Sequence, residues 1–331
     1  MKSIGVVVIG RNEGNRLHHC ILSVLGEGIR VVYVDSGSTD GSVALAQSLG
    51  VYVVELDKSL PFTAARARNV GFEHLLTIEP NIEFIQFVDG DCRVVEGWLT
   101  KAVSELIARP DVVVVCGQRK EEFPKNSVYN RLCDIEWNTP IGETKACGGD
   151  SMIRVSALKN VGGFNPTLIA GEEPELCVRL RQAGGMILRI DADMTWHDAR
   201  MTHFSQWWKR SQRGGYAYAE GSWLHGAISE RHWVKESRSI WFWGLLLPLL
   251  AVIAVWPTKG VSIILLLIAY SVLAYRIYQY ILKRGFSSED AIVYSLFCIL
   301  GKLPQVQGQI QFHISQLLKQ KTTIIEYKNA T

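Results

Sequence analysis

The sequence carries little excess charge and has no patterned cysteines. Its 331 residues include 35 Lys and Arg against 32 Asp and Glu, so the formal net charge is only +3. Without a basic tail to neutralise a polyanion, nucleic acid is not expected as a partner. The seven cysteines show no CxxC and no regular spacing. An odd, unpatterned set indicates reduced thiols in a cytosolic compartment rather than a disulfide framework.

Three common signatures are also missing. The segment GRNEG at residues 10–14, after the first apolar run, is not GxGxxG, which disfavours a dinucleotide-binding dehydrogenase. Neither GxxxxGKS nor GxxxxGKT occurs, which disfavours a P-loop enzyme. The apolar run at residues 4–9 is too short for the core of a cleavable signal peptide, so none is expected.

Short apolar runs alternate with helix-length patterns over the first 120 residues. This alternation predicts an α/β fold with a Rossmann-like, mostly parallel sheet and helices on both faces. The predicted strands are residues 4–9, 30–34, 51–55, 84–88 and 112–116, and the predicted helices are residues 17–25, 42–49, 63–76 and 98–107.

Two long stretches nearer the C-terminus contain no charged residue. They cover residues 239–258 and 260–275, with Lys259 between them. A membrane-spanning helix needs about 20 apolar residues, so we expect a transmembrane hairpin with helices at about 239–257 and 260–282. A hydrophobic core hairpin and a re-entrant pair are the alternatives. The expected domains are a catalytic domain at residues 1–225 and a membrane-associated helical region at residues 226–331.

The charges that flank this hairpin predict its orientation. Three basic residues precede it and three follow it, whereas the turn carries only Lys259. By the positive-inside rule, both flanks and the catalytic domain face the cytoplasm, at the cytoplasmic (inner) membrane. The flanking residues are Arg231, Lys235, Arg238, Arg276, Lys283 and Arg284.

A further helical region is expected after the hairpin, at about residues 288–320. The segment SSED at residues 287–290 supplies a cap and an acidic first turn for a helix start. The run at residues 291–300 is shorter than a membrane span, although a third span is an alternative. Beyond Pro304, apolar residues recur every three or four positions, which predicts an amphipathic helix. They are Val306, Ile310, Ile314 and Leu317.

The motif Asp89-Gly90-Asp91 follows the predicted strand at residues 84–88 directly. Ligands bind outside the carboxyl ends of the strands in an open α/β sheet, so a site is expected here. Two carboxylates this close repel each other unless a cation lies beside them. The oxygen-preferring ions Mg²⁺ and Mn²⁺ suit such a pair and often hold substrate phosphates as well. The alternative is a solvated turn.

An acidic segment at residues 171–176 predicts a second chemical function. Pro174 suits the first turn of a helix, which places Glu172 and Glu173 at the helix N-terminus. The macrodipole there favours the ionised carboxylate, whereas crowding with Glu175 raises its proton affinity. A general base needs both properties. The alternative is an ordinary acidic first turn.

Five motifs in this order together resemble glycosyltransferase family 2, the inverting nucleotide-sugar transferases with the GT-A fold. The resemblance covers roughly residues 4–215. The motifs are VIGRNE at residues 8–13, the loop at 35–40, ARARNVG at 65–71, DGD at 89–91 and GEEPEL at 171–176. It implies that the first two loops hold the nucleoside, that DGD holds Mn²⁺ or Mg²⁺ and the donor diphosphate, and that Glu173 is the base. Glu172 is the second candidate.

The resemblance also implies which residues bind the donor. Many members carry a second Asp in the loop after strand two, where this chain has Ser36, so the identity of the nucleotide stays open. Arg66 is favoured over Arg68 for the diphosphate because it lies nearer the helix start. The expected donor-binding residues are Gly10, Asn12, Glu13, Asp35, Ser36, Asp40, Arg66, Asp89, Gly90 and Asp91. Asp40 is also a candidate helix cap.

The remaining expectations concern the acceptor and the metal. Gly148 and Gly149 resemble the acceptor-side glycine pair of the family, although a plain turn explains them equally well. Trp207 and Arg213 lie in an aromatic and basic segment that suits a sugar, a lipid phosphate or a membrane surface. His197 is a candidate third metal ligand beside Asp89 and Asp91, with a structural histidine as the alternative.

The sequence therefore predicts an inverting, metal-dependent glycosyltransferase of the hexosyltransferase type, anchored in the membrane. Its expected partners are a nucleotide-diphosphate sugar and a lipid-linked or glycan acceptor used in polysaccharide biosynthesis. Two alternatives remain: a sugar nucleotidyltransferase, and a catalytically inactive membrane scaffold of a polysaccharide assembly complex. The first should show a Gly-rich, Arg-bearing phosphate loop after the first strand, and the second should have lost its acidic motifs.

Overall fold

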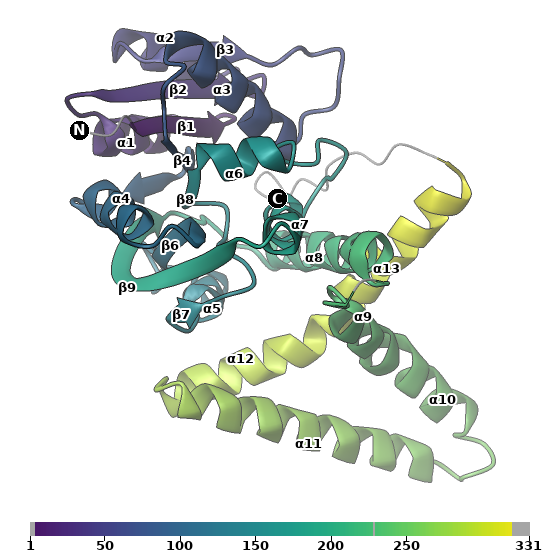
Figure 1. Cartoon of the computed structure of the whole chain (residues 1–331). Helices are drawn as coiled ribbons and strands as arrows, with labels where there is room; N and C mark the ends of the chain where they lie inside the picture. Colours follow the sequence, from purple (N-terminus) through teal and green to yellow (C-terminus); the bar gives the residue numbers. More distant parts are fainter. Residues whose placement is uncertain (1–3, 228, 320–331) are drawn as a thin grey trace. The chain divides into compact units, whose positions relative to one another are not determined.

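The computed structural model describes residues 4–227 and 229–319, which form two compact units (Figure 1). The first unit comprises Met1–Phe123 and Glu136–Ala199, and the second comprises Pro124–Ile135 and Arg200–Thr331. The chain therefore enters the second unit briefly, returns to the first, and then completes the second.

The first unit is built on one nine-stranded mixed sheet, in the order β3-β2-β1-β4-β8-β6-β9-β5, with β7 paired to β9. The α/β class expected from the sequence is confirmed. The part of the sheet from β3 to β4 is parallel, whereas β8 pairs antiparallel with both β4 and β6. The strands are β1 Ile4–Gly10, β2 Ile29–Asp35, β3 Tyr52–Glu55, β4 Phe84–Asp89, β5 Cys92–Val94, β6 Val112–Glu121, β7 Gly142–Glu143, β8 Ser151–Arg154 and β9 Met186–His197.

The register of three neighbouring strands brings their carboxyl ends to one edge. In β1 and β2, Gly10 pairs with Asp35, and in β1 and β4, Ile9 pairs with Asp89. Because the chain order reverses on either side of β1, the loops after β1, β2 and β4 open at the crevice where α/β sheets bind ligands.

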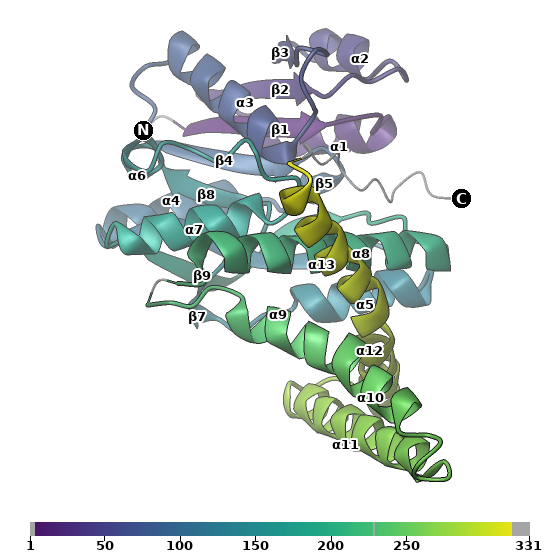
Figure 2. The ribbon, with the colours of Figure 1, turned by 90° about the vertical axis from the view of Figure 1, so that its right-hand side faces the viewer.

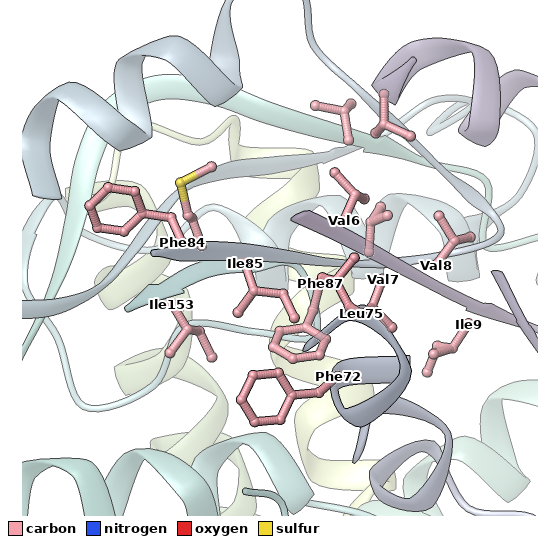
Figure 3. Close-up of a cluster of buried hydrophobic side chains, with 14 of the residues drawn as sticks. Val6, Val7, Val8, Ile9, Phe72, Leu75, Phe84, Ile85, Phe87 and Ile153 are labelled. Atoms are coloured by element: carbon pink, nitrogen blue, oxygen red, sulfur yellow. The ribbon is translucent and has the colours of Figure 1, made fainter. Parts of the chain in front are cut away.

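The core of this unit lies between the sheet and its helices. Figure 3 shows Phe72 of α3 beside Phe87 of β4, and Leu75 of α3 beside Phe87 and Val7 of β1. A Cβ at Gly71 would lie 2.5 Å from Val7 Cγ1, so glycine lets α3 approach the sheet closely. The helices of this unit are α1 Asn15–Val24, α2 Ser42–Ser48, α3 Ala64–Ile78, α4 Trp98–Ala108, α6 Val155–Asn160 and α7 Glu172–Gln182.

The second unit is helical (Figure 2). Its long helices α8 and α13 pack side by side because glycines remove the side chains at the crossing. A Cβ at Gly308 would lie 2.0 Å from the Gln212 carbonyl oxygen, and one at Gly215 would lie 2.1 Å from that of Gln305. The elements are α5 Val128–Trp137, whose last two residues belong to the first unit, α8 Phe204–His225, α9 Val234–Trp241, η1 Phe242–Leu246, α10 Leu247–Ile253, α11 Val261–Lys283, α12 Ser288–Leu300 and α13 Lys302–Leu317.

Two helices of this unit are long and apolar enough to cross a membrane. They are Val234–Ile253, which joins α9, η1 and α10, and Val261–Lys283, which is α11. The first begins earlier than the sequence suggested, because helical geometry continues through the charged residues before position 239. The side chains of α11 are largely exposed, as Leu265 at 60 % shows. An apolar hairpin of this kind is consistent with a transmembrane pair.

The region after the hairpin forms two helices rather than one. The predicted start of α12 is confirmed: Ser287 Oγ accepts a hydrogen bond from the Asp290 amide. Helix α13 has the expected amphipathic pattern, but Val306 and Phe312 are buried while Ile314 is exposed. The glycine contacts with α8 determine which face of α13 packs against that helix. Residue 320 of the expected range lies outside the described residues.

Candidate active site

The loops after β1 and β2 are joined by hydrogen bonds. The Asn12 amide donates to Ser38 Oγ at 2.9 Å, and Asn12 Oδ1 accepts from the Thr39 amide at 2.7 Å. Asp40 accepts from the Gly14 amide in one loop and from the Ser42 amide at the start of α2, at 3.0 Å each. The two loops therefore form one surface. The cap position of α2 is Gly41 rather than Asp40, although the Asp40 carboxylate accepts from the amide of Ser42, the first residue of the helix.

Asp35 lies beneath this surface. Its carboxylate is fully buried and accepts hydrogen bonds from the Tyr33 hydroxyl at 2.7 Å and from the amides of Gly37 and Ser38. The adjacent Ser36 remains partly exposed. Asp35 therefore fixes the loop conformation, and any contact between its side chain and a nucleoside stays a prediction.

Asp89 lies between two arginines at the carboxyl end of β4. Its Oδ1 accepts from Arg68 Nη2 at 2.8 Å, and its Oδ2 lies 3.5 Å from Arg119 Nη2. Burial alone would raise the pKa of Asp89, but the two guanidinium groups hold it below its usual range. Gly90 continues the strand edge by donating its amide to the Ile9 carbonyl at 2.8 Å.

Each of these arginines is shared with a second carboxylate. Arg68 Nη1 donates to Glu172 Oε1 at 2.6 Å, which connects α3 with the first turn of α7. Arg119 pairs with the fully buried Asp150 at 2.7 Å. The result is a chain of alternating charges that fixes the position of Asp89 relative to α7.

The glycine pair lies directly against this network. Gly148 adopts a φ of 85°, and a Cβ at Gly149 would lie 2.9 Å from Asp89 Oδ2 and 3.0 Å from Arg68 Nη2. A plain turn explains Gly148, but the close approach to charged side chains explains why Gly149 has no side chain.

Asp91 and His197 are brought together by strand pairing. In the antiparallel pair of β5 and β9, Cys92 lies opposite His197, and His197 Nε2 lies 3.2 Å from Asp91 Oδ2. On the other side of β9, Glu121 lies opposite His197, with its Oε2 3.8 Å from Nδ1. Burial lowers the pKa of His197, but Asp91 and Glu121 outweigh that effect and raise it.

This donor set fits a divalent cation. Asp91 and His197 are both buried, with Asp91 Oδ2 3.2 Å from His197 Nε2, and Cys92 lies beside them, whereas Asp89 groups with Cys92 and Asp150 rather than with this pair. Oxygen and imidazole ligands suit Mn²⁺, and oxygen ligands suit Mg²⁺. Glu121 lies on the Nδ1 side of the imidazole, where a carboxylate commonly orients a metal-binding histidine. The edge of the Trp137 ring covers the same histidine, with 4.6 Å between ring centroids.

Glu172 and Glu173 have different surroundings, although they are neighbours in sequence. Glu172 is paired with Arg68, whereas Glu173 Oε1 accepts from the Cys147 amide at 2.6 Å and lies 2.9 Å from the sulfurs of Cys147 and Cys177. Glu175 pairs with Arg179 at 2.7 Å. The three carboxylates of this first turn thus each have a separate partner.

The other predicted site residues contact the loops and strand ends around this centre or lie in the second unit. Arg66 donates to the carbonyl oxygens of Asp57, Leu60 and Pro61, so it stabilises the loop before α3. Glu13 is buried in an ion pair with Arg16, and Gly10 packs against the Glu13 side chain. In the second unit, Trp207 is 3 % exposed and packs edge-on against Phe297, which is the position of a core residue. Arg213 stays a predicted acceptor residue.

Sequence reasoning missed Arg119, Asp150 and Glu121, and it ranked Arg68 below Arg66. A signal for Arg68 was present: residues 68, 71, 72 and 75 recur with helical spacing and are the buried stripe of α3. No comparable signal marked Arg119 and Asp150, because the partner strand β8 is short and pairs with residues far away in sequence.

Comparison with known proteins finds a matching family model and relatives of similar sequence. The model of glycosyl transferase family 2 matches residues 5–161. The pre-mycofactocin glycosyltransferase of Mycobacterium tuberculosis is 26 % identical over 222 residues, which cover 62 % of this chain and 44 % of that protein. The succinoglycan biosynthesis protein ExoA of Rhizobium meliloti is 29 % identical over 173 residues, covering 49 % of this chain and 52 % of that protein. The chain thus spans about half the length of these two relatives.

Solved structures with the same fold include two that cover most of the chain. A mannosyltransferase of Pyrobaculum calidifontis, in complex with GDP-Man and Mn²⁺, has a TM-score of 0.60 at 15 % identity, covering 94 % of this chain and 86 % of that one. TarS residues 1–349 of S. aureus has a TM-score of 0.51 at 15 % identity, covering 97 % and 92 %. These similarities show a shared GT-A fold.

Proposed function

Because this chain belongs to glycosyl transferase family 2, we propose that it moves a sugar from a nucleotide-diphosphate sugar to a hydroxyl group of a lipid-linked or glycan acceptor. Transfer would occur with inversion at the cytoplasmic face of the membrane. The observation that carries this proposal is that Arg68 joins Asp89 to Glu172 at the start of α7, while Asp91 of the same motif pairs with His197.

The donor would lie along the loops after β1, β2 and β4. The joined surface of Asn12, Ser36 and Asp40 is the proposed nucleoside side. Asp91, His197 and Asp89 are the proposed ligands of Mn²⁺ or Mg²⁺, which would neutralise charge on the departing nucleoside diphosphate when bound. Arg68 and Arg119 already neutralise Asp89, so they would hold the motif in place whether or not a donor is bound.

Glu173 is the proposed base, and Glu172 the second candidate. Glu172 is already held by Arg68 Nη1 at 2.6 Å, which leaves it less free to contact an acceptor hydroxyl. Among the residues that the structure describes, Glu173 meets only neutral donors, and all of them contact Oε1. The other oxygen would take the proton of the acceptor hydroxyl as that hydroxyl attacks the anomeric carbon from the opposite face. Gly148 and Gly149 would let the acceptor approach the backbone.

The test is incubation of the full chain in detergent or membranes with a panel of labelled nucleotide sugars and Mn²⁺ or Mg²⁺. Metal-dependent release of nucleoside diphosphate with transfer, or hydrolysis when acceptor is absent, is the expected result. Exchange of label into pyrophosphate would instead identify a sugar nucleotidyltransferase. No turnover of any donor with any metal would favour the inactive scaffold and overturn the proposal.

A further inference from the structure

A buried cluster of two thiols and a carboxylate lies at the first turn of α7. Cys147 Sγ and Cys177 Sγ are 3.6 Å apart, and each lies 2.9 Å from Glu173 Oε1. Glu173 and Cys177 are four residues apart, so they share one face of the helix. The exposed fractions are 3 % for Cys147, 7 % for Glu173 and 0 % for Cys177.

The chemistry of this cluster differs from that of the Asp91 and His197 site. Thiolate sulfur is a soft ligand that selects Zn²⁺ and similar ions over Mg²⁺ or Mn²⁺, which prefer oxygen. Structural and catalytic Zn²⁺ is bound tetrahedrally by Cys, His and carboxylate ligands, with Zn–S distances of about 2.3 Å. That geometry separates two sulfur ligands by about 3.8 Å. The present 3.6 Å separation is already close to this value, so the sulfurs need to move little.

We propose that Cys147, Cys177 and Glu173 form a binding site for one thiophilic divalent cation of the Zn²⁺ class, and that a cation bound there inhibits transfer. The inhibition rests on the proposed function, because the ion would occupy the carboxylate assigned as the base. On binding, the two S–H groups release their protons to solvent, two metal–sulfur bonds form, and Glu173 Oε1 supplies a third ligand.

The cluster has a defined state without the cation as well. Burial raises the pKa of both thiols, so they stay protonated and donate to Glu173 Oε1. The same three side chains thus hold the carboxylate for catalysis in one state and bind the soft ion in the other. The site of Asp91 and His197 also has one thiol beside it, that of Cys92, whereas the present cluster offers two. Because Mn²⁺ prefers oxygen ligands, saturating Mn²⁺ would fill the first site without filling the second.

The test uses the full chain in detergent, with a phosphine reductant and saturating Mn²⁺. Cd²⁺ is the probe, because its bonds to thiolates absorb in the ultraviolet. Titration should give one Cd²⁺ per chain with the absorbance of two thiolates. Cys147→Ser and Cys177→Ser should each remove about half of that absorbance and weaken binding by at least about tenfold. Cys298→Ser, which removes a partly exposed thiol of α12, is the control and should change neither.

Transfer is measured in the same titrations, with Zn²⁺ in parallel. The wild-type protein should lose activity as the thiolate absorbance rises, and each serine variant should require at least about tenfold more cation for half-inhibition. Thiolate absorbance that is unchanged in both serine variants would overturn the site. If a serine variant fails to fold, Glu173→Gln serves in its place: it keeps both thiols and should keep the absorbance with weaker affinity. Stoichiometric Cd²⁺ binding without inhibition would uphold the site and overturn Glu173 as the base.

Discussion

At the residue scale, the two aspartates of the Asp89-Gly90-Asp91 motif have different tasks. Asp89 is neutralised by Arg68 and Arg119, whereas Asp91 faces His197. A cation at this point would therefore depend mainly on Asp91 for its anionic ligand. This division of roles also explains why Arg68 and Arg119 need not contact the donor to matter for binding.

Asp91→Asn tests this division of roles. The change keeps the shape of the side chain but removes its charge, and losing one partner of a buried charged pair costs about 3–5 kcal/mol. Metal-dependent donor binding, measured by calorimetry with and without Mn²⁺, should weaken by about a hundredfold or more. Asp111→Asn, an exposed aspartate at the opposite end of β6, is the matched control. Undiminished Mn²⁺-dependent binding in Asp91→Asn would refute the metal assignment.

Glu173→Gln tests the base. Glutamine keeps the size of the side chain and an oxygen for the Cys147 amide, but it cannot take up a proton. Donor binding should stay near that of the wild type, and the transfer rate should fall by about 10²–10⁴-fold. Both are measured on the same preparation.

Glu172→Gln is the companion variant. It should slow transfer much less, and any loss should include weaker donor binding, because it breaks the ion pair that fixes Arg68 beside Asp89. The reverse pattern, with Glu172→Gln inactive and Glu173→Gln active, would move the base by one residue. Full activity in both variants would contradict the mechanism.

Whether a site residue could be identified from the sequence depends on whether its partners are near to it or distant from it in the chain. Asp89, Asp91 and the strands before them follow from local patterns, because a buried strand and its exit loop are contiguous in sequence. The pairing of Asp91 with His197 depends on β5 lying against β9, about a hundred residues later. Single-chain patterns carry no record of that register, and His197 was expected beside Asp91 only because of the family resemblance. Partners such as Arg119 and Asp150 therefore become visible only in the folded chain.

At the scale of single elements, helix α8 contains a buried carboxyl without compensation. In the described part of the chain, Glu220 Oε2 is buried with no hydrogen-bond partner, and burial raises the pKa of Glu220 to about 7. The ordinary value is 4.5. Between these values only the unfolded state has lost the proton, so stability falls as pH rises. Above pH 7 the folded protein carries the full cost of ionising Glu220. At about 1.4 kcal/mol per unit of pKa difference between the folded and unfolded states, that cost is roughly 3 kcal/mol.

Glu220→Gln should remove this pH dependence. Between about pH 5 and pH 8 the free energy of unfolding of the wild-type protein should fall by roughly 3 kcal/mol because of Glu220. In the variant this fall should be absent. Thermal unfolding in detergent across that pH range measures the difference. Glu27→Gln, on an exposed turn, controls for the loss of one negative charge. Parallel profiles for the wild type and Glu220→Gln would show that Glu220 is already ionised in the folded state.

At the scale of the whole molecule, the exposed apolar hairpin is the proposed membrane anchor. Deleting everything after about residue 235 would also remove α13, whose Gly308 and Phe312 pack within the helical unit. Such a deletion would confuse release from the membrane with unfolding. Substitution on the exposed face of α11 avoids that problem.

The double variant Leu265→Asp, Ile268→Asp places two charges where the side chains are 60 % and 54 % exposed. A charged residue at the centre of a membrane-spanning helix costs about 2.5–3.5 kcal/mol, so the protein should appear in the supernatant after a salt and carbonate wash. Leu22→Asp, Ile107→Asp changes two similarly exposed apolar residues of the first unit and should remain in the membrane pellet. Retention of both double variants would mean that the hairpin is not the anchor.

The interleaving of the chain has a consequence for building chimaeras from this protein. Arg131, in the short early segment of the helical unit, forms ion pairs with Glu289 and Asp290 at the start of α12. Asn130 of the same segment accepts a hydrogen bond from the Met201 amide. A graft that transplants residues 200–331 alone would leave the start of α12 and the segment before α8 without these partners. The exchangeable module is therefore discontinuous, and a swap between relatives has to carry residues 124–135 together with residues 200–331.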